Sequence, residues 1–418
     1  MKHIRHIGDI GSIKNIKREI RELKNVNVHK KRISDRNTFW LFILLLILLA
    51  HYYLYRTVGV RLGGLLEAVW LVIGFFAILS SVAVRRLEPP RRARKRMTLQ
   101  SAIYRFGACW NIFVVLTTLF MLVSRPLRLP VLWEFAVSCV VALALCTYGV
   151  YEARTIRSTK FTLESDKVMG ETLRIVQITD LHISPYMILA HVKRVVDAVL
   201  AAKPDIVVIT GDLVDGIVGD GEGVAPFYRL FARQLKRLGR GSEWRPALGV
   251  WAVPGNHDYY QGFGNSCDFM ELAHIALLSG EKRDLGPLML LGADDLDHLK
   301  RSEENPDLSK SEALVASLSD HEARKFVLLL RHRPVVEPNT VGQFDLQLSG
   351  HTHGGQFVTI PSSMHRIPGK PKGLLSLGKS SSLYVSNGAG FVGPPMRFLA
   401  PAEIVVIDLV PGGLEGQG

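Results

Sequence analysis

Four long apolar stretches in the first 151 residues limit the folds open to this chain of 418 residues. Each stretch is close to the ~20 residues that a helix needs to cross the hydrocarbon core of a bilayer. The first begins too late, and is followed by too many others, to be a cleavable signal peptide. We therefore predict four transmembrane helices, over residues 39–55, 62–84, 106–123 and 129–151.

The basic residues between these stretches predict their orientation. Segment 1–36 carries 11 Lys and Arg and the loop 85–105 carries 8, whereas the other two connections carry 2 each. Cytoplasmic loops of membrane proteins are enriched in Lys and Arg. The alternation thus predicts a multi-pass cell membrane protein whose N-terminus, middle loop and everything after residue 151 are cytoplasmic.

The net charge of +13 comes from the first third of the chain. Residues 1–154 hold 24 Lys and Arg against 8 Asp and Glu, and the remainder holds 27 against 30. Basic segments interleaved with apolar stretches suit an anionic bilayer surface, so we expect a lipid bilayer as partner and no nucleic acid. Segment 1–36 fits either an amphipathic helix on that surface or a solvated tail.

Three ionisable residues, His51, Glu67 and Glu134, fall near the non-cytoplasmic ends of the predicted spans. Such groups suggest either a polar cluster or a head-group site. Side chains this close to an interface can also reach water by snorkelling, which is the interpretation we favour.

After residue 153 the pattern changes to short Val- and Ile-rich runs that alternate with helical periodicity. Continuous apolar runs such as 173–179, 205–210 and 344–348 are typical of strands buried on both faces. We expect an α/β layered domain after the apolar region. The predicted division is a basic segment (1–36), a transmembrane region (37–152), this domain (153–410) and a flexible tail (411–418).

Polar side chains suited to metal binding follow five of these predicted strands, where α/β sheets place their sites. Each short motif alone could be a helix cap or a turn, but all five share one structural position. Oxygen and imidazole donors without thiolates suit Mn²⁺, iron or Zn²⁺, and seven ligands suit two ions that share a carboxylate. The polar residues at these positions are Asp180, His182, Asp212, Asp215, Asn256, His257, Asp258, His332, His351 and His353.

The same residues, in order, resemble the motifs of the calcineurin-like metallophosphoesterases over residues 160–410. The motifs are Asp180-x-His182, Gly211-Asp212-x-x-Asp215, Gly255-Asn256-His257-Asp258, His332 and Gly350-His351-Thr352-His353. The extension through Gln356, with segments 291–295 and 384–388, resembles a bacterial membrane-anchored branch that includes UDP-2,3-diacylglucosamine pyrophosphatases. One departure is Arg331-His332-Arg333, because a small residue is expected before this histidine.

The resemblance implies a fold and a set of roles. The fold would be a four-layer β-sandwich of mixed sheets flanked by helices, within the α/β (α+β) class. Two divalent ions are implied, Mn²⁺ first and iron or Zn²⁺ as alternatives. Asp180, His182 and His353 would hold one ion, Asn256, His332 and His351 the other, and Asp212 would bridge them.

Paired ions lower the pKa of a shared water towards ~7, and the resulting hydroxide would attack phosphorus in line with the leaving oxygen. His257 lies beside a ligand and could either protonate the leaving group or stabilise the charge of the pentacoordinate phosphorus. Asp215 and Asp258 could orient imidazoles, and Arg331 and Arg333 could grip a second phosphate. All four are equally compatible with solvated surface positions.

These features predict a membrane-anchored phosphohydrolase that cleaves a phosphodiester or pyrophosphate bond of a lipid or nucleotide-lipid. Roughly 20 residues separate the last apolar stretch from the first strand, a reach of at most ~70 Å, so the site stays near the cytoplasmic leaflet. One alternative is a phosphoesterase for soluble nucleotides or phosphomonoesters. Another is a non-enzymatic membrane scaffold or sensor with a structural metal, and no motif indicates an oligomeric state.

Overall fold

The computed structural model describes residues 29–83, 94–184, 187–215, 224–240, 246–260, 262–295, 310–357 and 372–412. The predictions for the amphipathic segment, for part of the basic middle loop and for most of the tail fall outside these residues. The chain forms two compact units. Among the described residues, the sandwich unit runs from Arg154 to Phe391 and resumes at Leu399, and the helical unit combines 29–153 with Val392–Phe398.

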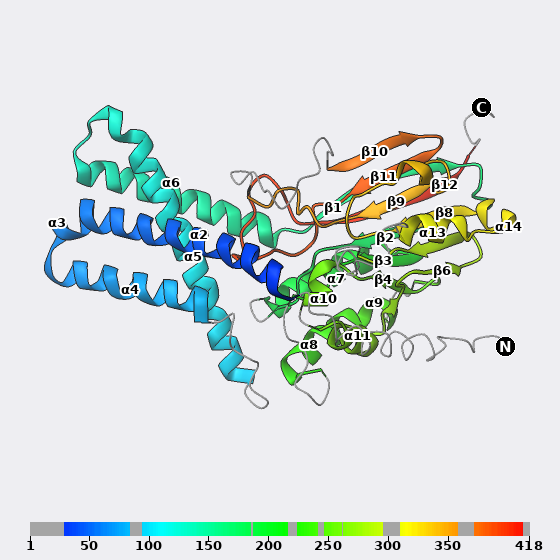
Figure 1. The fold of residues 1–418 in the computed structure, drawn as a ribbon, viewed down its shortest axis with the longest axis horizontal. Helices are drawn as coiled ribbons and strands as arrows, with labels where there is room; N and C mark the ends of the chain where they lie inside the picture. The colour runs from blue at the N-terminus through cyan, green and yellow to red at the C-terminus, as the bar shows by residue number, and fades with distance from the viewer. Residues whose placement is uncertain are drawn as a thin grey trace. The chain divides into compact units, whose positions relative to one another are not determined.

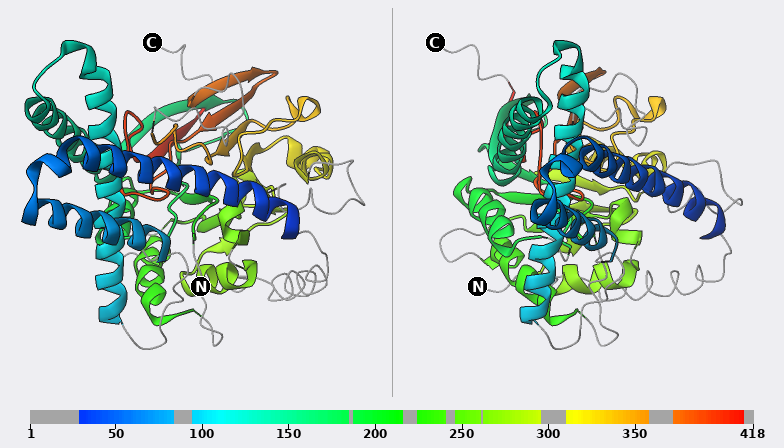
Figure 2. Two further views of the ribbon diagram at one scale, coloured as in Figure 1. Left: turned by 60° about the vertical axis from the view of Figure 1, so that its left-hand side comes forward. Right: turned by 90° about the vertical axis from the view of Figure 1, so that its left-hand side faces the viewer.

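The helical unit contains the four long helices α2 (His29–Leu54), α4 (Gly64–Ala83), α5 (Arg94–Ser124) and α6 (Val131–Arg154), and Figure 2 draws the ribbon in two further views. These helices pack around a small apolar core to which Leu54, Val114 and Met121 contribute. Short turns join them: η1 (Tyr55–Gly59), α3 (Val60–Leu62) and η3 (Arg125–Leu127).

Among the described residues, three helices are long and apolar enough to cross a membrane, not the four predicted. They are Leu41–Gly59, Ser101–Leu127 and Val131–Arg154. The second predicted stretch becomes α4, a helix of 20 residues, of which Glu67–Leu79 is the apolar part among the residues whose side chains the structure describes. Gly63 and Gly64 both have positive φ, so α4 begins at Gly64, two residues after the predicted start of the stretch at residue 62.

The ionisable groups of the helical unit do not all reach outwards. His51 is buried, and its Nε2 lies 3.2 Å from Asn111 Oδ1. Glu134 is buried as well and accepts a 2.9 Å hydrogen bond from Ser124. The snorkelling interpretation is therefore wrong for these two residues, whereas half-buried Glu67 accepts a hydrogen bond from the Tyr55 hydroxyl.

Two six-stranded mixed sheets form the centre of the sandwich unit (Figure 1). The first has the order β1-β12-β2-β3-β4-β5 and the second β10-β11-β9-β8-β7-β6. Strands β2 to β5 run parallel, as do β7, β8, β9 and β11, so their carboxyl ends share one edge in each sheet. The strands are β1 (Arg157–Ser165), β2 (Leu173–Ile178), β3 (Ile206–Thr210), β4 (Val250–Val253), β5 (Ala276–Leu277), β6 (Glu281–Asp284), β7 (Leu288–Gly292), β8 (Phe326–Leu330), β9 (Leu346–Ser349), β10 (Gly373–Gly378), β11 (Ser381–Val385) and β12 (Glu403–Pro411).

Strand β3 shows why its run is continuously apolar. Ile206 and Val208 pack into the core between the sheets, whereas Val207 and Ile209 point to the opposite face. Both faces are thus covered, and each fully buried aliphatic side chain stabilises the fold by ~1.5–3 kcal/mol.

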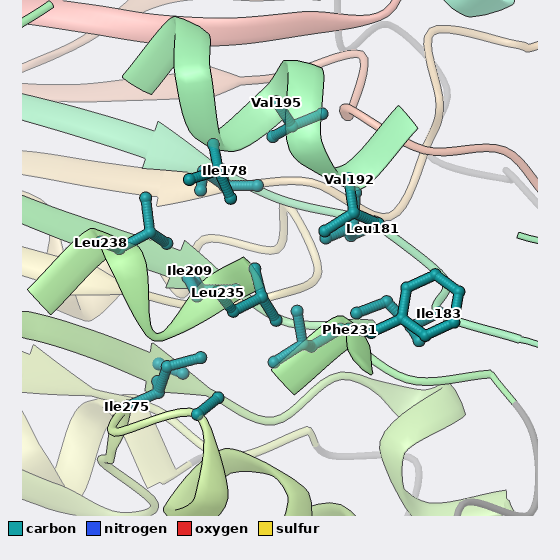
Figure 3. Packing of buried hydrophobic residues seen from close by; sticks show 14 of the residues in the cluster. Ile178, Leu181, Ile183, Val192, Val195, Ile209, Phe231, Leu235, Leu238 and Ile275 are labelled. Carbon is teal, nitrogen blue, oxygen red and sulfur yellow. The ribbon is translucent and has the colours of Figure 1, made fainter. Parts of the chain in front are cut away.

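Helices cover the outer face of each sheet. Figure 3 shows Val192, Val195 and Phe231 packed over Ile178 and Ile209 of the first sheet. This confirms an α/β arrangement of helix, sheet, sheet and helix. The helices are α7 (Leu189–Ala201), α8 (Pro226–Leu235), α9 (Arg237–Arg240) and α11 (Phe263–Leu272) beside the first sheet, α13 (Lys310–Ala316) and α14 (Asp320–Ala323) beside the second, and the short α10 (Asn256–Tyr260) and η4 (Pro338–Thr340).

Candidate metal centre

The seven predicted ligands all follow the carboxyl ends of strands in the two sheets. Strands β2, β3 and β4 of the first sheet lead into the loops of Asp180, Asp212 and Asn256. Strands β8 and β9 of the second sheet lead into the loops of His332 and His351. Parallel neighbours bring their following loops to the same edge of each sheet, and His182 and His353, 171 residues apart, come into contact there.

One group of possible ligands consists of Asp180, His182 and His353. Their donor atoms lie within 4.8 Å of one another, and all three residues are buried. His182 Nε2 is 3.0 Å from His353 Nε2, which is in turn 3.5 Å from Asp180 Oδ1. Two imidazole nitrogens and a carboxylate oxygen in this geometry can hold one divalent ion.

A second group consists of Asp212, His332 and His351. Asp212 Oδ2 is 3.1 Å from His332 Nε2, which lies 3.2 Å from His351 Nδ1. The Nδ1 of His332 is 2.8 Å from the carbonyl oxygen of Thr210. Because a carbonyl only accepts hydrogen bonds, His332 must carry its proton there, which leaves Nε2 free to bind metal.

Asp212 connects the two groups. Its Oδ2 lies 3.6 Å from His182 Nε2 in the first group and 3.1 Å from His332 Nε2 in the second. Its other oxygen accepts a 2.8 Å hydrogen bond from the backbone N–H of His257. This carboxylate is placed to be shared by two ions.

Backbone strain is concentrated at these residues. Five of the non-glycine residues with positive φ are candidate ligands: Asp180 (54°), His182 (49°), Asp212 (51°), His351 (71°) and His353 (50°). Each such conformation costs of order 1–3 kcal/mol and persists only where the surrounding structure imposes it. Gly255 shows how tight the packing is, since a Cβ there would lie 2.2 Å from Asp212 Oδ1.

Two further observations show that the residues fit metal ions. Asn256 Oδ1 is buried, and among the described residues no donor lies within hydrogen-bonding distance of it. Burial raises the pKa of the Asp180 carboxyl, because a carboxylate in a dry interior is costly. A bound cation would offset that cost and would give the Asn256 oxygen a partner.

His257 pairs with Asp215. Its Nδ1 is 2.9 Å from Asp215 Oδ1, and the ring lies at the rim of the centre. Burial opposes protonation of His257, but the charges of Asp215 and then Asp212 outweigh it and raise the pKa of His257 to about 9. The imidazole is therefore positively charged at neutral pH, although its proximity to His182 and Asp212 would also permit a metal-ligand role.

Asp258 binds backbone groups rather than an imidazole. Its carboxylate accepts hydrogen bonds from the N–H groups of Gly255 at 2.8 Å and of Val214 at 3.0 Å. These bonds join the loops after β3 and β4. Asp258 thus fixes the backbone that presents Asp212 and Asn256.

The two predicted phosphate-binding arginines differ from each other. Arg331 is buried, and its guanidinium bonds both carboxylate oxygens of Glu337, at 2.7 and 2.6 Å. Arg333 is partly exposed, and its Nε lies 3.1 Å from the buried carboxylate of Asp295. Of these two arginines, only Arg333 keeps a partly exposed side chain.

Two residues near the centre were not assigned a role from the sequence. Asp295 anchors Arg333, and Tyr260 accepts a 3.2 Å hydrogen bond from Asn256 Nδ2. The i, i+4 spacing of Asn256 and Tyr260 could have indicated this contact, but residues at that spacing are neighbours only if the segment is helical, as it is in α10.

Known proteins share this arrangement of motifs. The family model of calcineurin-like phosphoesterases matches residues 173–355. An "Uncharacterized metallophosphoesterase" of Aquifex aeolicus is 32% identical over 272 residues, which cover 64% of this chain and 97% of that protein. The chain belongs to the calcineurin-like metallophosphoesterase family. It is thus a metal-dependent phosphoesterase, and its ligand loops lie within the matched range.

Two other metallophosphoesterase relatives extend the comparison. An "Uncharacterized metallophosphoesterase" of Helicobacter pylori is 33% identical over 278 residues, 64% of this chain and 69% of that protein. A "Transmembrane protein with metallophosphoesterase domain" of Danio rerio is 26% identical over 296 residues, 66% of this chain and 62% of that protein. Relatives of this metallophosphoesterase thus include one described as a transmembrane protein.

Proposed function

We propose that this metallophosphoesterase is a membrane-anchored hydrolase with two metal ions, acting on a phosphodiester or pyrophosphate bond of a lipid or nucleotide-lipid. The position of Asp212 carries the proposal. One of its oxygens lies within 3.6 Å of an imidazole nitrogen from each ligand group. A single bridging carboxylate between two triads is the arrangement that a dinuclear phosphoesterase needs.

The donor set suits Mn²⁺, iron or Zn²⁺, and we take Mn²⁺ as the first ion to test. Asp180, His182 and His353 would hold one ion, and Asn256, His332 and His351 the other. When bound, the ions offset charge on the phosphoryl oxygens and acidify water.

The protein residues then handle the leaving group. His257 Nδ1 is occupied by Asp215, so Nε2 is the nitrogen available to a substrate. As the bond between phosphorus and the leaving oxygen breaks, His257 gives that oxygen its proton, and water supplies the new oxygen on phosphorus. The charge of Asp215 keeps the imidazole protonated for this step.

The helical unit supports the membrane part of the proposal. Apolar side chains such as Leu41, Phe75 and Val140 are more than 60% exposed on its surface. A soluble protein rarely exposes so many large apolar groups, whereas lipid chains would cover them. We place the sandwich unit at the cytoplasmic leaflet because of the basic residues between the helices.

The test is to purify the full chain in detergent and measure metal content and hydrolysis. Mn²⁺-supplemented assays would compare bis-p-nitrophenyl phosphate, p-nitrophenyl phosphate, soluble nucleotides and UDP-diacylglucosamine, with Asp212→Asn as the control variant. We expect two ions per chain and the fastest turnover with the lipid substrate. Faster turnover of soluble nucleotides or of the monoester would overturn the lipid assignment, and a single ion per chain would overturn the dinuclear centre.

A further inference from the structure

Tyr260 lies at the end of α10, one helical turn after Asn256. Its hydroxyl oxygen is 3.2 Å from Asn256 Nδ2, and its ring centroid is 5.0 Å from that of His257. The side chain is 42% exposed, so it contributes less burial than a core tyrosine. Its position beside two residues of the centre therefore calls for an explanation other than core packing.

The hydrogen bond ties the Asn256 amide to the Tyr260 hydroxyl and so fixes the plane of the side chain. An asparagine side chain carries an NH₂ group that only donates and an oxygen that only accepts or binds metal. With Nδ2 donating to Tyr260, the buried Oδ1 is the end left without a donor among the described residues. Rotation of the amide by 180° would present NH₂ in place of oxygen, and NH₂ cannot bind a cation.

We propose that Tyr260 is a positioning residue for the metal centre, holding the Asn256 amide with its oxygen towards the second ion. The inference rests on the dinuclear site of the proposed function and adds a residue outside the motifs that supply the ligands. Tyr260 acts on the ion through Asn256 and does not touch it. Groups that orient a metal ligand in this way typically change metal affinity ~10- to 100-fold when they are removed.

The variant Tyr260→Phe removes only the hydroxyl. Its matched control is Tyr259→Phe on the same short helix, because the Tyr259 hydroxyl donates to Asp294 instead. Mn²⁺ binding to the metal-free full chain in detergent would be followed by calorimetry and by the electron paramagnetic resonance of coupled Mn²⁺ pairs. Thermal unfolding of the metal-free variants would show whether they are folded.

We expect Tyr260→Phe to bind its first ion like wild type and its second ion ~10-fold or more weakly. The Mn²⁺ concentration for half-maximal activity should rise by the same factor, with kcat at saturating Mn²⁺ unchanged. Tyr259→Phe should keep both affinities.

Two outcomes would overturn the inference, and they differ. Equal second-ion affinity in Tyr260→Phe and wild type would reject the role of Tyr260 and leave the proposed function intact. A wild-type chain that binds fewer than two ions would reject the dinuclear site itself, and the inference with it.

Discussion

The helical unit and the sandwich unit both bury polar side chains, but the groups are arranged differently. In the helical unit, Asn111 meets His51 and also donates to the carbonyl oxygen of Ala77, while Thr118 donates to that of Ala50. These are separate contacts, and the buried Glu134 carboxylate likewise meets single partners, the Ser124 hydroxyl at 2.9 Å and the Arg125 guanidinium at 3.7 Å. In the sandwich unit, carboxylates and imidazoles crowd within 4.8 Å of one another on strained backbone.

The difference shows which buried polar groups indicate chemistry. A buried amide with its hydrogen bonds made can serve packing alone. Crowded ionisable groups, a raised carboxyl pKa and positive φ at Asp180 together indicate a site suited to a cation. Burial alone does not distinguish His51 from His332, because both imidazoles are buried.

The largest expected effect is on kcat and comes from replacing His257 in the sandwich unit. His257→Ala should lower kcat by ~10²–10⁴ with metal content unchanged, because it removes the proton donor and no assigned ligand. Steady-state hydrolysis and metal analysis test this, with the exposed His321→Ala as control. Full turnover in His257→Ala would show that the crowded site of the sandwich unit does not use His257 as its proton donor.

The next effect is on the free energy of unfolding of the sandwich unit and comes from breaking the ion pair of Arg331 and Glu337. Arg331→Ala should lower the free energy of unfolding by ~3–5 kcal/mol, because it leaves Glu337 partly buried without its guanidinium. Arg283→Ala, which breaks the exposed pair with Glu281, should cost ~1 kcal/mol or less. Denaturant unfolding measures both, and equal losses would show that Arg331 is not a structural residue.

A smaller effect concerns pH. The charges of Asp215 and Asp212 raise the pKa of His257 to about 9 in the metal-free fold, so the imidazole is an acid at neutral pH and activity should fall once rising pH removes its proton. Asp215→Asn removes the main charge that raises this pKa, and the alkaline limb of kcat/KM should move to lower pH by about one unit or more. An unmoved limb would mean that His257 does not supply the proton.

The smallest effect belongs to the helical unit. Asn111→Leu removes the contacts to His51 and Ala77, and such bonds between membrane helices contribute on average less than ~1 kcal/mol. We expect a slightly less stable helical unit, seen by unfolding in mixed micelles, and unchanged kcat. A large loss of activity would show that these polar groups take part in function.

Much of the fold and of the metal centre could be predicted from the sequence, because an apolar strand and the polar residues that follow it can be recognised within a short segment of chain. The order of polar residues after β2, β3, β4, β8 and β9 was readable without knowing how the sheets meet. The side-chain orientation of Arg331 could not be predicted, because it depends on the ion pair with Glu337, which follows Pro334 in the chain. The break at Gly63 and Gly64 was hidden inside a run of otherwise apolar residues.

The ligands belong to loops from both sheets, Asp180 and Asp212 from one and His332 and His353 from the other. A cation pair held there would cross-link the two halves of the domain at one rim. Chelation should then do more than abolish activity. Once the ions are removed, the loops at that rim should become accessible to proteases and to hydrogen exchange under conditions in which the apolar core of the domain is still folded.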